Sequence, residues 1–276
     1  MADHMPPAGR RLLSGIRCPR PLSGHAKAGT VTPVTEIKNE RTRGMKRNLL
    51  SVVIGSLLAM FAGQARAAHQ IVWKFDRLHD IGGVATHVEG HPQIISTPAG
   101  KAVAFNGVDD ALFIDQHPLA GAKTFTEEAI IRPDGGAFEQ RWMHLAEVDP
   151  ATGKDSGTRF LFEIRVVKDR WYLDAFTTGP GYNKTLAVPE KTFPVGPWYA
   201  VEQTYDGKMY RSYVNGVLQA EAPIDFKPQG LGHASVGVRI NHVNYFHGAI
   251  LEARFTSRAL RPKQFLKVPA SLTAAK

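Results

Sequence analysis

Two Asx-Gly dipeptides, nine residues apart, constrain the fold of this chain more than any other feature of its sequence. Asp206-Gly207 separates Trp198–Tyr205 from Lys208–Val214, and Asn215-Gly216 separates that run from Val217–Ala220. The runs are rich in β-branched and aromatic residues, and both dipeptides suit type I′ turns, whose two central residues have positive φ. The whole segment is therefore predicted to be a three-stranded antiparallel meander.

Ten further short runs have a similar composition and are bounded by turn residues. They are Ile71–Phe75, Gln93–Ser96, Ala102–Phe105, Ala111–Ile114, Phe125–Arg132, Trp142–Val148, Phe160–Val167, Trp171–Thr177, Ala234–Ile240 and Ala249–Thr256. No long stretch has a helical period, and only Pro262–Leu266 is expected to form a helical turn. Regularly spaced strands without intervening helices predict a sandwich or a barrel, and no internal repeat divides them.

The positive charge of the chain lies in its N-terminal part. The formal net charge is +9, but residues 1–67 hold 11 of the 34 Lys and Arg and only 3 of the 25 Asp and Glu. Residues 68–276 therefore have 23 basic and 22 acidic residues, a net charge of +1. Because binding to a nucleic-acid backbone needs a concentrated basic face, this distribution argues against a nucleic-acid partner.

A signal-peptide pattern begins at Met45. Lys46-Arg47 forms a charged region, Leu49–Ala62 forms an apolar region, and Ala65-Arg66-Ala67 provides the small residues that a signal peptidase reads. The apolar run is shorter than the roughly 20 residues of a transmembrane helix, so we expect cleavage and no membrane span afterwards. The expected location of the protein is secreted or periplasmic.

Residues 1–44 fit neither a signal peptide nor a globular segment, since they are rich in Arg, Pro and Gly and lack an amphipathic period. We interpret them as a non-native upstream extension or a disordered leader. The only cysteine, Cys18, lies there, so the folded part has no disulfide and no cysteine-based metal site. The predicted organisation is this extension, a signal peptide over 45–67 and one folded domain over 68–276.

Four motifs follow one another along the predicted domain. They are Ala104-Phe105-Asn106-Gly107-Val108-Asp109-Asp110, the run FTEEAIIRP at 125–133, Trp198–Gly207 with Tyr213–Gly216, and Phe246–Phe255 with Arg258-Ala259-Leu260. In this order they resemble the laminin G-like members of the concanavalin A-like lectin/glucanase superfamily. The resemblance spans Ile71 to Phe265 and implies an all-β, two-sheet antiparallel jelly-roll sandwich. It implies less about activity, because this fold hosts lectins, adhesion modules, hydrolases and lyases.

Calcium is the one cofactor that the resemblance suggests. Asp109 and Asp110 are the residues that would hold it, since oxygen ligands in a turn suit this ion. Leu251 stands where many members of the family have Asp, which weakens the implied site. The alternative is that both carboxylates cap the backbone of their own turn after Asn106-Gly107. No other cofactor is predicted.

Glu127 and Gln203 stand where relatives have apolar residues, at positions that face the core. An unpartnered buried polar group costs about 1–3 kcal/mol. We therefore expect both side chains to be hydrogen-bonded, either to each other across adjacent strands or toward a groove.

Catalytic motifs are largely missing from the sequence. It has no nucleophile elbow, no H-E-x-x-H pair and no phosphate-binding loop, and Glu163 is followed by Arg165 where hydrolases of this fold have a second carboxylate. Lyases of this fold use Arg, Gln or Asn, His and Tyr, for which Gln140, His144 and Tyr245 are available at a different spacing. An enzyme acting on polysaccharides is therefore the alternative to a non-catalytic module.

Polar side chains alternate with apolar ones on two predicted strands. Glu163 and Arg165 share one face of the first, and Arg239 and Asn241 share one face of the second, where Ile240 is expected to point inward. We predict that these four residues line a groove on the concave sheet, with Trp171 as a stacking ring. An unneutralised guanidinium there would bind a uronate or sulfate. In the alternative, Glu163 pairs with both arginines and the cluster is structural.

The sequence thus predicts an exported, lectin-like, non-catalytic module that binds carbohydrate, most specifically an acidic or cell-surface glycan. The first alternative is a lyase or hydrolase of the same fold. The second is a structural or adhesive domain that binds protein.

Overall fold

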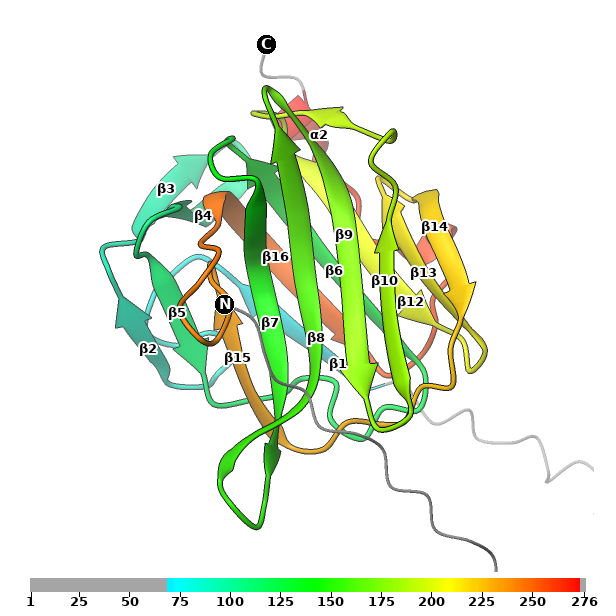
Figure 1. The fold of residues 1–276 in the computed structure, drawn as a ribbon. Coiled ribbons are helices and arrows are strands. Elements are labelled where there is room, and N and C mark those ends of the chain that lie inside the picture. Colours follow the sequence, from blue (N-terminus) through cyan, green and yellow to red (C-terminus); the bar gives the residue numbers. More distant parts are fainter. Residues whose placement is uncertain (1–68, 274–276) are drawn as a thin grey trace, which may run out of the picture. The chain divides into compact units, whose positions relative to one another are not determined.

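The computed structural model of the protein describes residues 69–273, which form two β-sheets packed face to face (Figure 1). The first sheet contains β1 (Gln70–Lys74), β3 (Gln93–Thr97), β4 (Gly100–Asn106), β6 (Phe125–Pro133), β12 (Tyr199–Tyr205), β13 (Met209–Val214), β14 (Val217–Pro223) and β16 (His247–Thr256). The second contains β2 (Thr86–Glu89), β5 (Ala111–Ile114), β7 (Glu139–Asp149), β8 (Lys154–Val167), β9 (Arg170–Gly179), β10 (Tyr182–Ala187), β11 (Phe193–Pro194) and β15 (Gly232–Val236).

All strand pairs are antiparallel, and the order in the first sheet is β14-β13-β12-β6-β16-β4-β3, with β1 also paired to β16. The order in the second is β10-β9-β8-β7-β15-β5-β2, with β11 paired to β9. The predicted all-β, two-sheet antiparallel sandwich is confirmed. The predicted extension and signal peptide, residues 1–44 and 45–67, lie outside the described residues.

Helical structure in the described part of the chain is short. A 3-10 turn, η2, covers Pro262–Gln264, where a helical turn is predicted, and α2 covers Ala270–Thr273. No helix among residues 69–273 is long and apolar enough to cross a membrane.

Every predicted strand is present. Three observed strands were not predicted, and one of the two predicted turns has a different conformation. β2 and β10 are short and carry polar side chains, and β11 is only Phe193–Pro194, so their composition does not separate them from loops. Asn215 and Gly216 both have positive φ, 51° and 72°, as a type I′ turn requires. The type I′ prediction for Asp206-Gly207 is wrong: only Gly207 has positive φ, and the Asp206 side chain accepts hydrogen bonds from the N–H groups of Lys208 and Met209.

The core lies between the sheets and is dominated by aromatic side chains. Trp73, Trp142, Trp171, Phe160 and Phe162 are all completely buried there. Along β8 the core residues Phe160, Phe162 and Ile164 alternate with the outward-facing Glu163 and Arg165, so this strand has one apolar and one polar face. The predicted inward and outward faces of β8 are therefore confirmed.

A row of polar side chains interrupts this core. Gln203 lies directly opposite Glu127 on β6 and Ser212 on β13, and all three are buried. Gln203 accepts a hydrogen bond from the Tyr210 hydroxyl, so the expected partner exists for this residue. The expectation fails for Glu127, since neither of its oxygens has a hydrogen-bond partner among residues 69–273.

The C-terminal segment covers the outer face of the first sheet. Leu266 and Leu272 pack against Ile130 and Ala200, which point away from the main core. The buried carboxylate of Glu128 accepts a hydrogen bond from the backbone N–H of Leu266, at 2.6 Å, which anchors the segment. The outer face of the second sheet has no such cover from this segment, and the charged side chains gather on it.

Candidate functional site

Two adjoining hollows lie on the outer face of the second sheet. The larger, the histidine hollow, has a volume of about 480 Å³ and is lined by Phe113 of β5 together with His87, His233 and His242. The smaller, the arginine hollow, has a volume of about 190 Å³ and is lined by His144, Arg159, Arg239 and Asn241. Asp155 and Ile240 line both hollows. Together the two form one groove.

The loop of residues 237–246 forms one wall of the groove. It leaves β15 through Gly237, whose φ is +84° and where a Cβ would lie 2.3 Å from the Phe105 ring. The backbone N–H of Ile240 donates to Nδ1 of His144 at 3.0 Å, and the N–H of Arg141 donates to the carbonyl of Asn244 at 2.9 Å. These two bonds hold the loop against β7, so its side chains have fixed positions over the sheet.

His144 forms a buried hydrogen-bond donor at the base of the arginine hollow. Burial, followed by the charges of Arg239 and Arg159, lowers the pKa of His144 to about 3, so the ring is neutral at pH 7. Since Nδ1 accepts from Ile240, the proton lies on Nε2. Nε2 has no partner among residues 69–273. This N–H is itself buried beneath the surface of the hollow.

Two guanidinium groups give the arginine hollow its charge. Arg159 donates to the carbonyl of Gly157 at 2.8 Å, and its guanidinium lies 5.4 Å from the centre of the Phe176 ring. Burial and then the charge of Arg239 lower the pKa of Arg159, which places the two cations near each other. Within the described part of the chain neither guanidinium forms an ion pair, whereas Arg141, Arg165 and His233 on the same face are paired with carboxylates. The hollow therefore suits a carboxylate or a sulfate.

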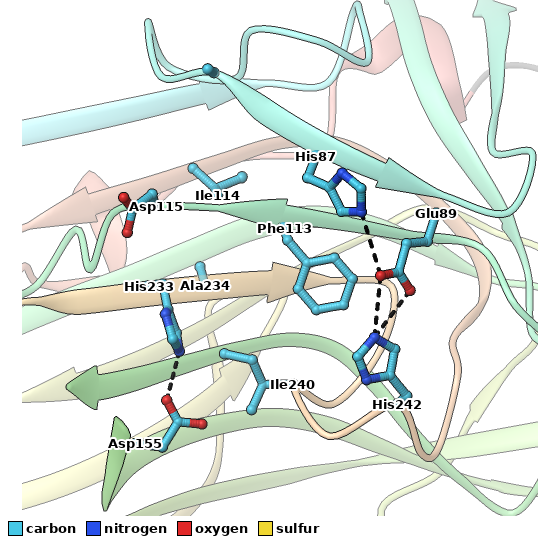
Figure 2. A pocket seen from close by; sticks show the side chains of 11 residues that line it. His87, Glu89, Phe113, Ile114, Asp115, Asp155, His233, Ala234, Ile240 and His242 are labelled. Atoms are coloured by element: carbon cyan, nitrogen blue, oxygen red, sulfur yellow. Dashed lines mark hydrogen bonds and ion pairs between the residues drawn. The ribbon is translucent and has the colours of Figure 1, made fainter. Parts of the chain in front are cut away.

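Phe113 forms the floor of the histidine hollow (Figure 2). Its ring centre is 5.1 Å from that of His242 and 6.2 Å from that of His87. Glu89 lies between the two histidines, with carboxylate oxygens 3.0 Å from Nε2 of His242 and 3.5 Å from Nε2 of His87. A partly exposed aromatic ring among polar groups is typical of sites that bind small, amphipathic rings.

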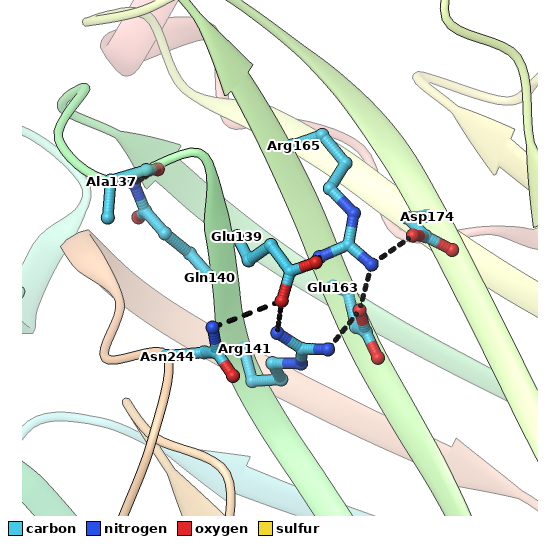
Figure 3. A network of polar contacts seen from close by, with 8 residues as sticks. All are labelled: Ala137, Glu139, Gln140, Arg141, Glu163, Arg165, Asp174 and Asn244. Carbon is cyan, nitrogen blue, oxygen red and sulfur yellow. Dashed lines mark hydrogen bonds and ion pairs between the residues drawn. The ribbon is translucent and has the colours of Figure 1, made fainter. Parts of the chain in front are cut away.

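A network of charges occupies the same face beside the groove (Figure 3). Glu163 pairs with Arg141 at 3.1 Å and with Arg165 at 3.0 Å, and Arg165 also pairs with Asp174 at 2.7 Å. Glu139 pairs with both arginines, so three carboxylates face two guanidiniums. Burial raises the pKa of Glu163 to about 7, although both arginines favour its charged form. The network has no surplus positive charge to offer an acidic ligand.

The four predicted groove residues therefore fall into two separate groups. Arg239 and Asn241 line the arginine hollow, whereas Glu163 and Arg165 belong to the paired network. Glu163 does pair with two arginines, as in the structural alternative, but the second is Arg141. The prediction that Ile240 points into the core is wrong, because β15 ends at Val236 and the chain then turns.

Trp171, predicted to stack on sugar, lies in the core instead. Its side chain is completely buried and packs against Tyr199 and Phe193, with ring centres 5.0 and 5.2 Å away. It shares the inward face of β9 with Leu173 and Ala175, so the alternation of the strand excludes it from the surface. Trp171 therefore has no free ring face and is not part of the candidate site.

Asp109 and Asp110 lie in the turn between β4 and β5. The two oxygens of Asp110 accept from the N–H groups of His91 and Asn106 at 2.6 and 2.9 Å, and Asp109 accepts from the Asn106 side chain at 2.7 Å. Asp110 therefore caps the backbone of its own turn, as in the alternative, whereas Asp109 accepts from a side chain. Residues 69–273 contain no group of three or more His, Cys, Asp or Glu side chains arranged to hold a metal ion. Calcium binding at this turn stays a prediction.

Gln140, a residue considered for lyase chemistry, is used by the fold. Its buried amide nitrogen donates to the carbonyls of Gly135 and Ala137 at 2.7 and 2.8 Å, and its oxygen accepts from the N–H of His247 at 2.9 Å. These three bonds leave it little capacity to neutralise a substrate carboxylate.

Sequence reasoning missed Arg159 and Phe113 as site residues, although the signal for both was present. Arg159 shares the outward parity of Glu163, and Phe113 lies between the core residues Leu112 and Ile114. The parity of each strand therefore places both side chains on the outer face.

Residues 106–264, more than half of the chain, match the family model Laminin_G_3, which describes the concanavalin A-like lectin/glucanases superfamily. No curated protein sequence matches the chain.

Solved structures with the same fold include two that contain sugars. One is domain 4 of AbnA, a GH43 extracellular arabinanase from Geobacillus stearothermophilus, in complex with arabinotriose; it is 17% identical, with a TM-score of 0.53 over 72% of this chain and 97% of that one. The other is the botulinum neurotoxin serotype D ligand binding domain in complex with N-acetylneuraminic acid. It is 12% identical, with a TM-score of 0.51 over 70% of this chain, which spans about half (48%) of its length.

Proposed function

Because the chain belongs to the concanavalin A-like lectin/glucanases superfamily, we propose that it is a carbohydrate-binding module whose ligand is an acidic glycan. The observation that carries this proposal is the arginine hollow, where Arg159 and Arg239 face a ligand without an ion-pair partner in the described chain. Two related folds were solved with arabinotriose and with N-acetylneuraminic acid, which supports carbohydrate as the class of ligand.

The groups in the hollow complement a sugar carboxylate or sulfate. A guanidinium can donate two parallel hydrogen bonds to either anion, and each bond to a charged group contributes about 1.5–3 kcal/mol. The ring of His144, which lines the same hollow, is neutral at pH 7 and adds no negative charge to it. Asn241, exposed on the loop, offers a donor and an acceptor for neighbouring hydroxyls.

Binding without catalysis accounts for this site better than a lyase reaction does. A lyase needs a base for the proton beside the carboxylate, but the pKa of His144 is about 3 and its Nδ1 is held by Ile240. Gln140 is committed to backbone groups. His144 and Gln140 are therefore committed to the fold, and the arginine hollow offers groups that hold an anion.

We further propose that the module is exported, since residues 45–67 have the pattern of a signal peptide. Its ligand would then be an extracellular or cell-surface glycan, and the domain would begin at residue 68.

Titration calorimetry with acidic and neutral polysaccharides tests this function. Arg239→Ala should lower affinity for the acidic ligand at least tenfold, as expected from the loss of one charge-assisted contact worth about 1.5–3 kcal/mol. Arg258→Ala, which removes an exposed arginine outside the groove, is the matched control and should bind as the unaltered protein does.

Two results would overturn the proposal. One is unchanged affinity of a folded Arg239→Ala protein for every acidic glycan that the unaltered protein binds. The other is the appearance of an unsaturated, ultraviolet-absorbing product during incubation, which would show lyase activity.

A further inference from the structure

The two hollows of the groove differ in charge. Among the described residues that line the histidine hollow are three carboxylates, Glu89, Asp115 and Asp155, and neither Lys nor Arg. The arginine hollow has two unpaired guanidiniums and shares only Asp155, which already pairs with His233 at 2.7 Å. An acidic sugar is therefore favoured in one hollow and disfavoured in the other.

A single ligand would occupy both hollows, because they share walls. Asp155 lies between them on the β7–β8 hairpin, and Ile240 lies between them on the 237–246 loop. Adjacent units of one chain would therefore lie in hollows of opposite character.

The histidine hollow has the features that a neutral sugar requires. The ring of Phe113 offers an apolar surface for the C–H face of a pyranose. The rings of His87 and His242 lie on either side of it (Figure 2). The carboxylates of Glu89 and Asp115 are acceptors for hydroxyl or amide N–H donors of the same sugar. A second carboxylate on that sugar would instead face like charge in a partly desolvated site.

We propose that the groove selects glycans in which an acidic sugar alternates with a neutral one, with the acidic unit in the arginine hollow and the neutral unit over Phe113. This inference rests on the proposed function and narrows its ligand class. It excludes polymers in which every unit is a uronic acid, because their second carboxylate would enter the histidine hollow. Selectivity then comes from the repulsive hollow as well as the attractive one.

Calorimetry with oligosaccharides of matched length tests the inference. Hyaluronan and unsulfated chondroitin alternate an acidic and a neutral sugar, whereas oligogalacturonate and oligomannuronate are acidic at every unit. At fixed ionic strength we expect at least one alternating ligand to bind tenfold or more tightly than either uniform one.

Variants of the histidine hollow test whether it selects the neutral sugar. Phe113→Ala should lower affinity for the alternating ligand about tenfold and leave weak binding of the uniform ligands unchanged, while Phe113→Tyr should retain affinity. Glu89→Gln combined with Asp115→Asn should raise the affinity for the uniform ligands. The ratio of the affinities for alternating and uniform ligands should therefore fall. Melting temperatures confirm that each variant is folded.

The outcomes distinguish failure of the inference from failure of the proposed function. If uniform ligands bind as tightly as alternating ones, and Arg239→Ala weakens both, the groove binds acidic glycans but the alternating preference is wrong. If Arg239→Ala changes no affinity, the proposed function is wrong as well. If Phe113→Ala weakens all four ligands equally, the histidine hollow does not discriminate and the inference is overturned.

Discussion

The buried carboxyl group of Glu127 should make the protein less stable as the pH rises. Burial, followed by the charges of Glu128 and Glu202, raises the pKa of Glu127 well above its ordinary value of 4.5. Its neighbour across the strand pair, Gln203, is neutral, so no cation stabilises the charged form. Glu127 is therefore expected to be protonated in the folded protein and ionised in the unfolded chain at neutral pH.

The magnitude follows from the difference in bound protons. Above pH 4.5 and below the folded pKa, the folded state holds one more proton than the unfolded state, so this group reduces the unfolding free energy as pH rises. Between these two pKa values the loss is about 1.4 kcal/mol per pH unit. Glu127→Gln keeps the shape of the side chain and removes the titration, so its stability relative to the unaltered protein should increase by that amount per pH unit over this window.

Urea denaturation of both proteins at pH 5.5, 6.5 and 7.5 measures this difference. The carboxyl group of Glu163, whose pKa burial raises to about 7, adds a slope of the same sign to both proteins and cancels on subtraction, while that of Glu202, with a pKa of about 8, is mostly protonated in the folded protein over this range. The exposed Glu190→Gln is the control and should show no pH-dependent difference. A difference between Glu127→Gln and the unaltered protein that stays constant with pH would refute the reasoning, because Glu127 would then be ionised in the fold.

Three further predictions concern packing, charge and processing. Trp171→Ala should lower the unfolding free energy by about 3–5 kcal/mol, measured by urea denaturation, and leave glycan affinity of the folded fraction unchanged; a large loss of affinity in a folded variant would show a binding role. Arg165→Ala should cost about 3–5 kcal/mol, because it leaves the buried carboxylates of Glu163 and Asp174 short of a cation, and a neutral effect would contradict the network. N-terminal sequencing of protein exported from a chain that begins at Met45 should give a terminus directly after Ala67, and a terminus upstream of Met45 would exclude the signal peptide.

Local sequence patterns predicted the strands, because the alternation of polar and apolar residues reports which face of a sheet each residue occupies. The Asn215-Gly216 turn was predictable for a similar reason, since its conformation depends on residues within the turn. The Asp206 turn was not, because the carboxylate of Asp206 binds two backbone N–H groups and stabilises a different conformation. A single side-chain interaction was enough to change the turn.

The site was less predictable because it depends on irregular features. A bulge between Arg141 and Met143 of β7 changes the parity of the strand, so that Arg141 and His144 both lie on the outer face. No period-2 pattern reveals this shift. The 237–246 loop likewise places Arg239 beside Arg159 through hydrogen bonds to β7 that involve residues about 100 positions apart. The sequence thus predicted correctly which face of a regular strand a residue occupies. It did not predict which side chains of neighbouring strands and loops that residue contacts.

The position of β16 determines when this chain can fold during its synthesis. β16 lies in the middle of the first sheet, between β6 and β4, and β1 pairs only with it. Asn106 of β4 pairs with His247, which follows it by 141 residues in the sequence. Synthesis of the intervening chain takes about 7–28 s at ordinary rates of translation. Until β16 is made, β4 and, once it is synthesised, β6 each have one edge without a partner strand. Polypeptides released before residue 247 are therefore expected to aggregate.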